Sequence, residues 1–324
     1  MFSPDRILAA FMVSAALSPS LLLAQSDFPN KPIRIVVANT PGSTVDLVAR
    51  HLAERLQPSL GQPIVILNQP GAAGLVGSQT IAQAPKDGYT LGFYGNTAVI
   101  VPHLQKSLAF DPIKDITTVA IVGNIPFVAV VPKDSPYQTL AQLIDAAKRS
   151  PGSIKLGSAG SGTAIHLAGM QFQSMAGIDM LHVPYKSNPQ VVTDLLGGQI
   201  SVFFGDVSTA LPPVRAGKLK GFAVSGLKRS PLAPDLPTID ESGLKGYELT
   251  AWFAAYVPAK TPMPIIEKLN AAFREALADK EVSSKLLAAG IEPETSTPDE
   301  LRKFQAAETQ KWDKIARDAK IEKE

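Results

Sequence analysis

The 324-residue sequence contains no cysteine and only four histidines. The absence of cysteine excludes disulfides, thiolate zinc sites and a thiol nucleophile. The histidines are scattered and no dense cluster of metal ligands accompanies them, while 31 basic against 29 acidic residues leave no basic stripe for nucleic acid. The composition therefore favours binding over chemistry, and we expect no cofactor, no metal ion and no nucleic-acid partner.

Long apolar runs are also scarce, since one covers residues 7–24 and no second follows it. This run comes after Arg6, contains Pro19 and ends in the small residue Ala24, which is typical of a secretory signal peptide over residues 1–24. A retained membrane anchor is the alternative, but the run is short and interrupted. We therefore predict that the mature protein lies outside the cytoplasm, in the periplasm.

What the sequence does have is a pair of Gly/Ser/Thr-rich turns, each following a short apolar run and opening a helix. The first loop (residues 40–44) follows residues 33–37, and the facing loop (residues 158–163) follows residues 154–156. The first N–H groups of a helix lack intrahelical partners, and the aligned peptide dipoles leave that end partly positive. Two such turns facing each other would hold a carboxylate without Arg or Lys.

Apolar runs alternate with helical patterns along the chain, as in an α/β protein with largely parallel sheets. We expect strands at 33–37, 64–67, 90–94, 127–131, near 154, 180–185, 200–204, 222–225 and 251–257. We expect helices at 46–57, after the capping box that starts at Thr139, and in two long terminal segments, the second opened by Thr297. Further turns at 68–74 and 95–97 follow strands, so the strand-end loops should converge on one ligand site.

The length of the chain favours two domains over one. A second α/β unit begins at the apolar run after residue 126, and the run at 251–257 reads as a strand that crosses back. We therefore predict one discontinuous domain at residues 27–126 and 250–324, and an inserted domain at residues 127–249.

In their order, the motifs of the chain resemble those of the periplasmic solute receptors of tripartite tricarboxylate transporter systems, the Bug receptors. They include Pro32–Val37, Pro41–Asp46, Asn68–Gly74, Asp87–Leu91, Gly160–Leu167, Val183–Lys186, Asp194–Gln199, Arg215–Leu219, Leu236–Thr238 and Gly246–Glu248. The resemblance covers nearly the whole mature chain. It implies a two-lobed α/β fold of the type II periplasmic-binding-protein class, with crossover strands joining two domains and the ligand between them.

The resemblance also implies a function without catalysis. The protein would bind a small organic carboxylate, whether a dicarboxylate, a tricarboxylate or an aromatic acid, and deliver it as a monomer to a membrane permease. The ligand would be held chiefly by main-chain N–H groups, hydroxyls and water. The residues implied are Gly42, Ser43, Thr44 and Asp46 in the first loop, and Ala159, Ser161, Gly162, Thr163 and His166 in the facing loop.

Three further residues complete the candidate site. Asn96 and Thr97 come from the loop after the third strand, and Asp206 follows the strand at 200–204. The chain departs from the family pattern twice: Ser43 stands where relatives commonly have a second Gly, and Gly205 stands where many carry Asp. An amino-acid ligand is therefore not assigned.

Each candidate also has a structural interpretation. A capping role is favoured for Asp46, because its carboxylate would repel a bound anion. His166 could face the ligand or be a structural histidine.

Two other functions stay open for the protein. One is a sensor that presents its liganded form to a signalling receptor. The other is a hydrolase using Ser161, His166 and Asp206, although the sequence lacks a Gly-x-Ser-x-Gly elbow.

Overall fold

The alternating apolar runs and amphipathic helices form an α/β fold in the computed structural model, which describes residues 28–71, 74–161 and 163–318. The predicted signal peptide, residues 1–24, lies outside them. The strands are β1 (Ile33–Val37), β2 (Ile64–Asn68), β3 (Thr90–Gly95), β4 (Ile116–Pro132), β5 (Lys155–Ser158), β6 (Leu181–Pro184), β7 (Val202–Asp206), β8 (Leu219–Val224), β9 (Thr250–Pro258) and β10 (Glu292–Pro293). The helices are α1 (Thr44–Leu60), α2 (Leu75–Ala82), α3 (Thr97–Leu104), α4 (Leu140–Arg149), α5 (Ala164–Ala176), α6 (Asn188–Leu196), α7 (Val207–Arg215), α8 (Met263–Ala278), α9 (Lys280–Ala288) and α10 (Pro298–Asp318).

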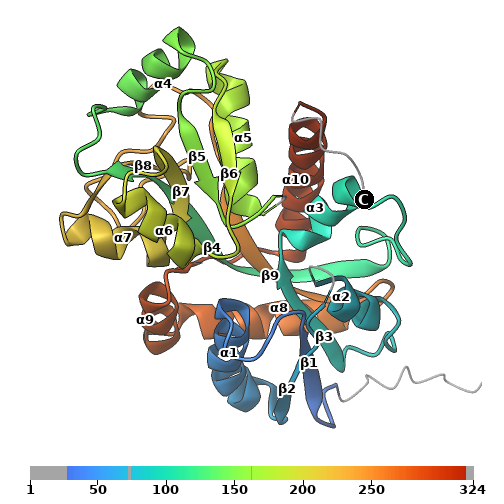
Figure 1. Cartoon of the computed structure of the whole chain (residues 1–324). Helices are drawn as coiled ribbons and strands as arrows, with labels where there is room; N and C mark the ends of the chain where they lie inside the picture. Colours follow the sequence, from blue (N-terminus) through green and yellow to red (C-terminus); the bar gives the residue numbers. More distant parts are fainter. Residues whose placement is uncertain (1–27, 72–73, 162, 319–324) are drawn as a thin grey trace, which may run out of the picture.

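The strands follow one path in the order β2-β1-β3-β9-β4-β7-β5-β6, with β8 and β10 also paired to β4. At one end β1 pairs in parallel with β2 and β3, and at the other end β5 pairs in parallel with β6 and β7. Figure 1 shows the resulting two lobes, with β5 to β8 in one and β1 to β3 in the other. The parallel strands of each lobe therefore end at a common edge, where the candidate loops begin.

The long strand β4 connects these two groups. Only its second half, residues 127–131, was expected as a strand, but it begins at Ile116. The first half pairs antiparallel with β9 as far as Pro126, and the second half pairs with β7 and β8 from Phe127 onward. The sheet is thus antiparallel in its middle, which differs from the largely parallel sheet predicted. Crossing in opposite directions is what two connecting strands must do when one leaves a lobe and the other returns to it.

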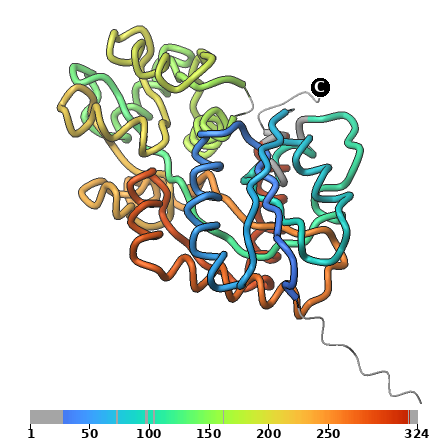
Figure 2. Tube along the Cα trace, turned by 90° about the horizontal axis from the view of Figure 1, so that it is seen from below, coloured from blue at the N-terminus to red at the C-terminus, as the bar shows by residue number. Residues whose placement is uncertain are grey.

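Hydrophobic periodicity positions α1 and β1 as predicted. Ile33 and Ile35 face one core with Leu52 and Leu56 of α1, whereas Val36 faces a second core on the other side of the sheet. Figure 2 shows α1 beside α8 and α9 from the C-terminal part of the chain, and Glu54 of α1 pairs with Lys285 of α9. Early and late segments of the described chain therefore build the same lobe.

Side-chain caps begin the helices that carry capping-box sequences. Thr139 Oγ1 accepts a hydrogen bond from Gln142 N at 3.2 Å, and Thr297 Oγ1 accepts one from Glu300 N at 3.2 Å. The Glu300 carboxylate in turn accepts from Thr297 N. These contacts satisfy N–H groups that have no partner inside the helix, which confirms both predicted helix starts.

Two strand ends differ from the prediction. Residues 95–97 form no extended loop, because Gly95 ends β3 and Thr97 begins α3. Gly95 is required for close packing: an added Cβ would lie 2.3 Å from the Trp252 carbonyl oxygen of β9. The helix α7 directly after β7 was not predicted, although Asp206 caps it.

Candidate ligand-binding site

The first loop connects β1 to α1 and is held from within. Ser43 is the N-cap of α1, and its Oγ accepts a hydrogen bond from Asp46 N at 3.3 Å. Gly42 adopts a left-handed conformation, with φ of 77°, that favours glycine. Ser43, which departs from the family pattern, therefore serves as a helix cap. Gly42 and Thr44 remain exposed beside it.

Asp46 braces the first loop. Its carboxylate is buried and accepts hydrogen bonds from Gly42 N at 2.8 Å, from Arg50 Nε at 2.9 Å and from Asn68 Nδ2 at 2.9 Å. Burial alone would raise the pKa of Asp46, but the donors from Arg50, Gly42 and Asn68 outweigh it and leave the pKa below its usual value. The carboxylate is thus ionised and engaged by the protein, and it ties the first loop to the end of β2.

The facing loop connects β5 to α5 with a similar cap. Thr163 is the N-cap of α5: its Oγ1 accepts from His166 N at 3.2 Å and donates to the Gly160 carbonyl at 2.8 Å. Gly160 has φ of 123°, so a side chain there would be strained. Ala159 is half-buried and Ser161 is exposed, whereas Gly162 lies outside the described residues.

Two stacked imidazoles lie beneath the facing loop. The rings of His166 on α5 and His182 on β6 have centroids 3.9 Å apart and an interplanar angle of 24°. His182 Nε2 lies 2.6 Å from Ser158 Oγ, which also accepts a hydrogen bond from Gly160 N at 3.2 Å. Burial, together with the charge of His182, lowers the pKa of His166 to about 4, and burial lowers the pKa of His182. Both rings are therefore neutral near pH 7.

His182 and Ser158 belong to this cluster, although the candidate residues chosen from the sequence include neither. In the parallel pairing of β5 with β6, Ser158 lies opposite Pro184, two residues beyond His182, so the two side chains share a face of the sheet. Because every second residue of a strand faces the same side, counting along both strands could have predicted that Ser158 and His182 lie on one face. The register that brings them together is a tertiary feature that neither segment reveals alone.

The remaining candidates lie where β3 meets α3 and where β7 meets α7. Asn96 donates from Nδ2 to the Thr250 carbonyl at 3.1 Å and accepts from Trp252 N at 2.8 Å, so its amide joins β3 to the start of β9. Thr97 is the first residue of α3. Asp206 is the N-cap of α7 and accepts from Thr209 N at 2.9 Å.

Asp206 is also engaged by Asn188 Nδ2 and by the Ser208 and Thr209 hydroxyls, so its carboxylate is fully occupied. At the neighbouring position, a Cβ on Gly205 would lie 2.4 Å from the Phe203 ring. An Asp at 205 would thus need Phe203 to move. The acid that ends this strand, Asp206, caps α7 instead.

The structure thus gathers the candidates into two clusters. Gly42, Ser43 and Asp46 form one network with Asn68, while Thr163 and His166 form another with Ser158 and His182. No hydrogen bond between described residues joins the first loop to the facing loop. Within the described ranges, no group of three Asp, Glu or His side chains could hold a metal ion.

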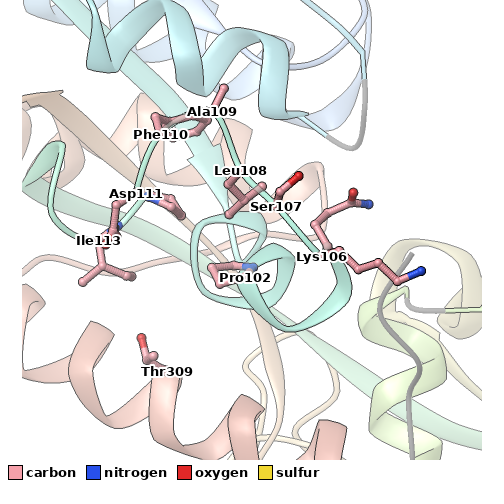
Figure 3. Close-up of a pocket in the computed structure, with 11 residues that line it drawn as sticks. Pro102, Lys106, Ser107, Leu108, Ala109, Phe110, Asp111, Ile113 and Thr309 are labelled. Carbon is pink, nitrogen blue, oxygen red and sulfur yellow. The ribbon is translucent and has the colours of Figure 1, made fainter.

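A separate groove of about 600 Å³ lies away from these loops. It is formed by residues 105–113 after α3, with Pro102 and with Thr309 of α10, as Figure 3 shows. None of the predicted site residues line it, so it carries no part of the binding hypothesis.

Two lobes joined by crossing strands, with helix N-termini at the strand ends of each, define the class of two-lobed solute-binding proteins. The sequence profile described as tripartite tricarboxylate transporter family receptor (TctC) matches residues 48–321. The chain therefore belongs to this family of solute-binding receptors, which are not enzymes.

Solved structures of similar proteins agree with this assignment. The periplasmic binding protein BugD is 31% identical, with a TM-score of 0.72 over 92% of this chain and 100% of BugD. Rpa4515 of R. palustris, solved with adipate, is 31% identical, with a TM-score of 0.75 over 90% of this chain and 98% of its own. MatC (Rpa3494) of Rhodopseudomonas palustris, solved with malate, is 29% identical, with a TM-score of 0.71 over 89% and 99%. Among the described residues, no helix is both long and apolar enough to cross a bilayer.

Proposed function

We propose that this protein is a periplasmic receptor that encloses a small organic carboxylate between its lobes and delivers it to a tripartite tricarboxylate-type permease. The observation that carries the proposal is the matched pair of capped helix N-termini, α1 and α5, at strand ends of different lobes. Each offers N–H groups and hydroxyls to an anion. The adipate and malate bound by two relatives make a dicarboxylate the first ligand class to test.

In this proposal the lobes are residues 27–126 with 250–324, and residues 127–249. The support is the change of partner along β4, from β9 to β7 and β8, between Pro126 and Phe127. The first and facing loops would close on the ligand while β4 and β9 absorb the rotation. Closure would exclude water and strengthen the polar contacts. Export depends on the proposed signal peptide, residues 1–24, and the receptor acts as a monomer.

The test is a thermal-shift screen of residues 25–324 with adipate, malate, succinate, citrate and benzoate, each matched by its amide. A ligand at a hundred times its Kd adds about 2.7 kcal/mol to the free energy of unfolding if it binds only the folded state. Stabilisation by an acid and not by its amide is expected. No stabilisation by any acid, with protein shown to be folded and free of co-purified ligand, contradicts the proposal.

Delivery to a permease needs its own test. Cells that carry the neighbouring membrane genes should accumulate the labelled acid only when this receptor is present. Binding without any effect on uptake would favour the sensor hypothesis instead.

A further inference from the structure

The stacked pair His166–His182 is connected to the facing loop by short contacts. His166 donates its backbone N–H to the cap residue Thr163, and His182 contacts Ser158, which accepts from Gly160 N. An anion held by N–H groups of this loop would therefore share hydrogen-bonded neighbours with the two imidazoles: Thr163 with His166, and Ser158 with His182. In a partly buried site such a negative charge acts strongly on nearby titrating groups.

We propose that the His166–His182 pair takes up one proton from solvent when a carboxylate binds at the facing loop, so that the affinity rises as the pH falls below neutrality. This inference rests on the proposed function, since it needs a carboxylate at that loop. The proton adds to a ring nitrogen, and the imidazolium formed offsets the negative charge of the ligand.

The geometry limits the uptake to one proton. With ring centroids 3.9 Å apart, two imidazolium rings would repel each other, so the pair titrates as a unit. Without a ligand, burial and the neighbouring ring keep both histidines neutral, as the lowered pKa values of both indicate. A bound anion adds an opposite charge beside the pair.

The charged side chains on the adjoining elements are either exposed, as Lys155 is, or paired with other residues. α5 and β6 carry no charged side chain besides the two histidines. The adjoining elements contribute Lys155 at the start of β5, Asp194 held by Tyr185, Asp206 held by Asn188, and Glu308 paired with Lys311. Among the described residues, His182 is the titratable group whose charge lowers the pKa of His166. The ligand is thus the charge that can reverse this shift.

Linkage fixes the sign and the size of the effect. If a ligand binds the protonated pair more tightly than the neutral pair, protonation of the pair raises the affinity for the ligand by the same factor. An opposite charge at short range shifts a pKa by about 1–3, which predicts about tenfold tighter binding near pH 5 than near pH 7.5. An acid with a single carboxyl group, such as benzoic acid, remains largely ionised down to about pH 5. A dicarboxylate takes up a proton of its own in this range, so that proton is measured with the free acid and subtracted from the uptake.

The experiment uses the acid with the largest thermal shift in the screen above. Calorimetry near pH 5 and pH 7.5, each in two buffers of different ionisation enthalpy, gives both the affinity and the number of protons taken up. The wild type should take up close to one proton near pH 5 and bind about tenfold tighter there than near pH 7.5. His166→Gln and His182→Gln should reduce the change in affinity to less than about twofold, whereas His51→Gln on α1, which lies outside the pair, should match the wild type.

A second measurement needs no variant. NMR titration of the four histidine rings in the wild type should show two rings with lowered pKa values that rise when the acid is added. Binding with no proton uptake, a flat pH dependence and unmoved ring titrations would overturn the inference and leave the proposed receptor function standing. Failure of every acid to bind at either pH would overturn both.

Discussion

The first loop and the facing loop share one backbone plan, but different forces hold them. Behind the first loop stands an ionised carboxylate, Asp46, fixed by Arg50 and Asn68. Behind the facing loop stand a hydroxyl, Ser158, and two neutral imidazoles. The comparison teaches that the loop before a helix N-terminus can be held by either a charged or an uncharged support, and that the two supports differ in their response to pH.

The largest effect should come from Asp46→Asn. The change removes the charge that accepts from three donors and places an amide N–H against one of them, so we expect a loss of about 2–3 kcal/mol in the free energy of unfolding. Denaturant titration measures it. The matched control is Glu54→Gln on the same helix, an exposed partner of Lys285, which should cost at most about 0.5 kcal/mol. Equal costs for the two variants would show that the first loop does not depend on its carboxylate.

The pH dependence of the free energy of unfolding should distinguish the histidine pair, which supports the facing loop, from Asp46, which supports the first loop. Burial and the charge of His182 place the pKa of His166 at about 4 in the folded protein, below the ordinary value of 6.5. The stability from the neutral ring is fully present above pH 6.5 and is lost as the pH falls toward 4. We expect a loss of about 1–2 kcal/mol in the free energy of unfolding by about pH 4.5.

Asp46 behaves differently in the same range. Its pKa is lowered from 3.8, so its contribution is present above that value and is lost only as the pH falls below it. Urea titrations of the unliganded protein between about pH 7 and pH 4.5 should therefore report the histidine pair, and His166→Gln should flatten the curve. A wild-type stability that stays constant over this range would contradict the contrast.

The two caps should contribute equally to stability. Ser43→Ala and Thr163→Val each remove the acceptor for one helix N–H group, at a cost of about 1 kcal/mol. Both should also weaken binding of the acid found in the screen. Thr139→Ala, at the cap of α4, is the matched control and should lower stability by a similar amount without changing binding. If Thr139→Ala weakened binding as much as the two loop variants do, ligand binding would not depend specifically on the first loop and the facing loop.

The smallest effect on stability is expected for Ser161→Ala, because this side chain is exposed. The free energy of unfolding should change by less than about 0.5 kcal/mol. If the hydroxyl donates to the ligand, calorimetry should show weaker binding. Binding identical to that of the wild type would leave recognition at the facing loop to its backbone and to Thr163.

The sequence predicted features that local patterns determine. The strand at 33–37 and the helix face of Leu52 and Leu56 follow from hydrophobic period, and the caps at Thr139 and Thr297 follow from short-range hydrogen bonding. The first half of β4, from Ile116 to Pro126, was missed because its identity depends on β9, a partner more than a hundred residues later in the chain. Local propensity carries no information about such a pairing.

The candidate site divides in the same way. Ser43 and Thr163 occupy positions that a loop-to-helix pattern reveals, and the structural interpretation of Asp46 rested on its place in the first turn. By contrast, the links from Asn96 to Thr250 and from Ser158 to His182 require the completed sheet. From the sequence, the Asp206 carboxylate was a candidate for ligand contact, because its hydrogen-bond donor Asn188 lies on a separate element, α6.

The position of β9 between β3 and β4 has a consequence for how the chain folds. Residues 90–95 and 116–132 are synthesised early, yet their shared neighbour is complete only at residue 258. Until then the first half of the sheet has unpaired backbone on two strands, which is a template for association with other chains. We expect fragments that end before residue 250 to aggregate or to need a chaperone. The lobe with β1 to β3 therefore cannot complete its sheet before the chain has returned, whereas the strands of the other lobe all precede β9.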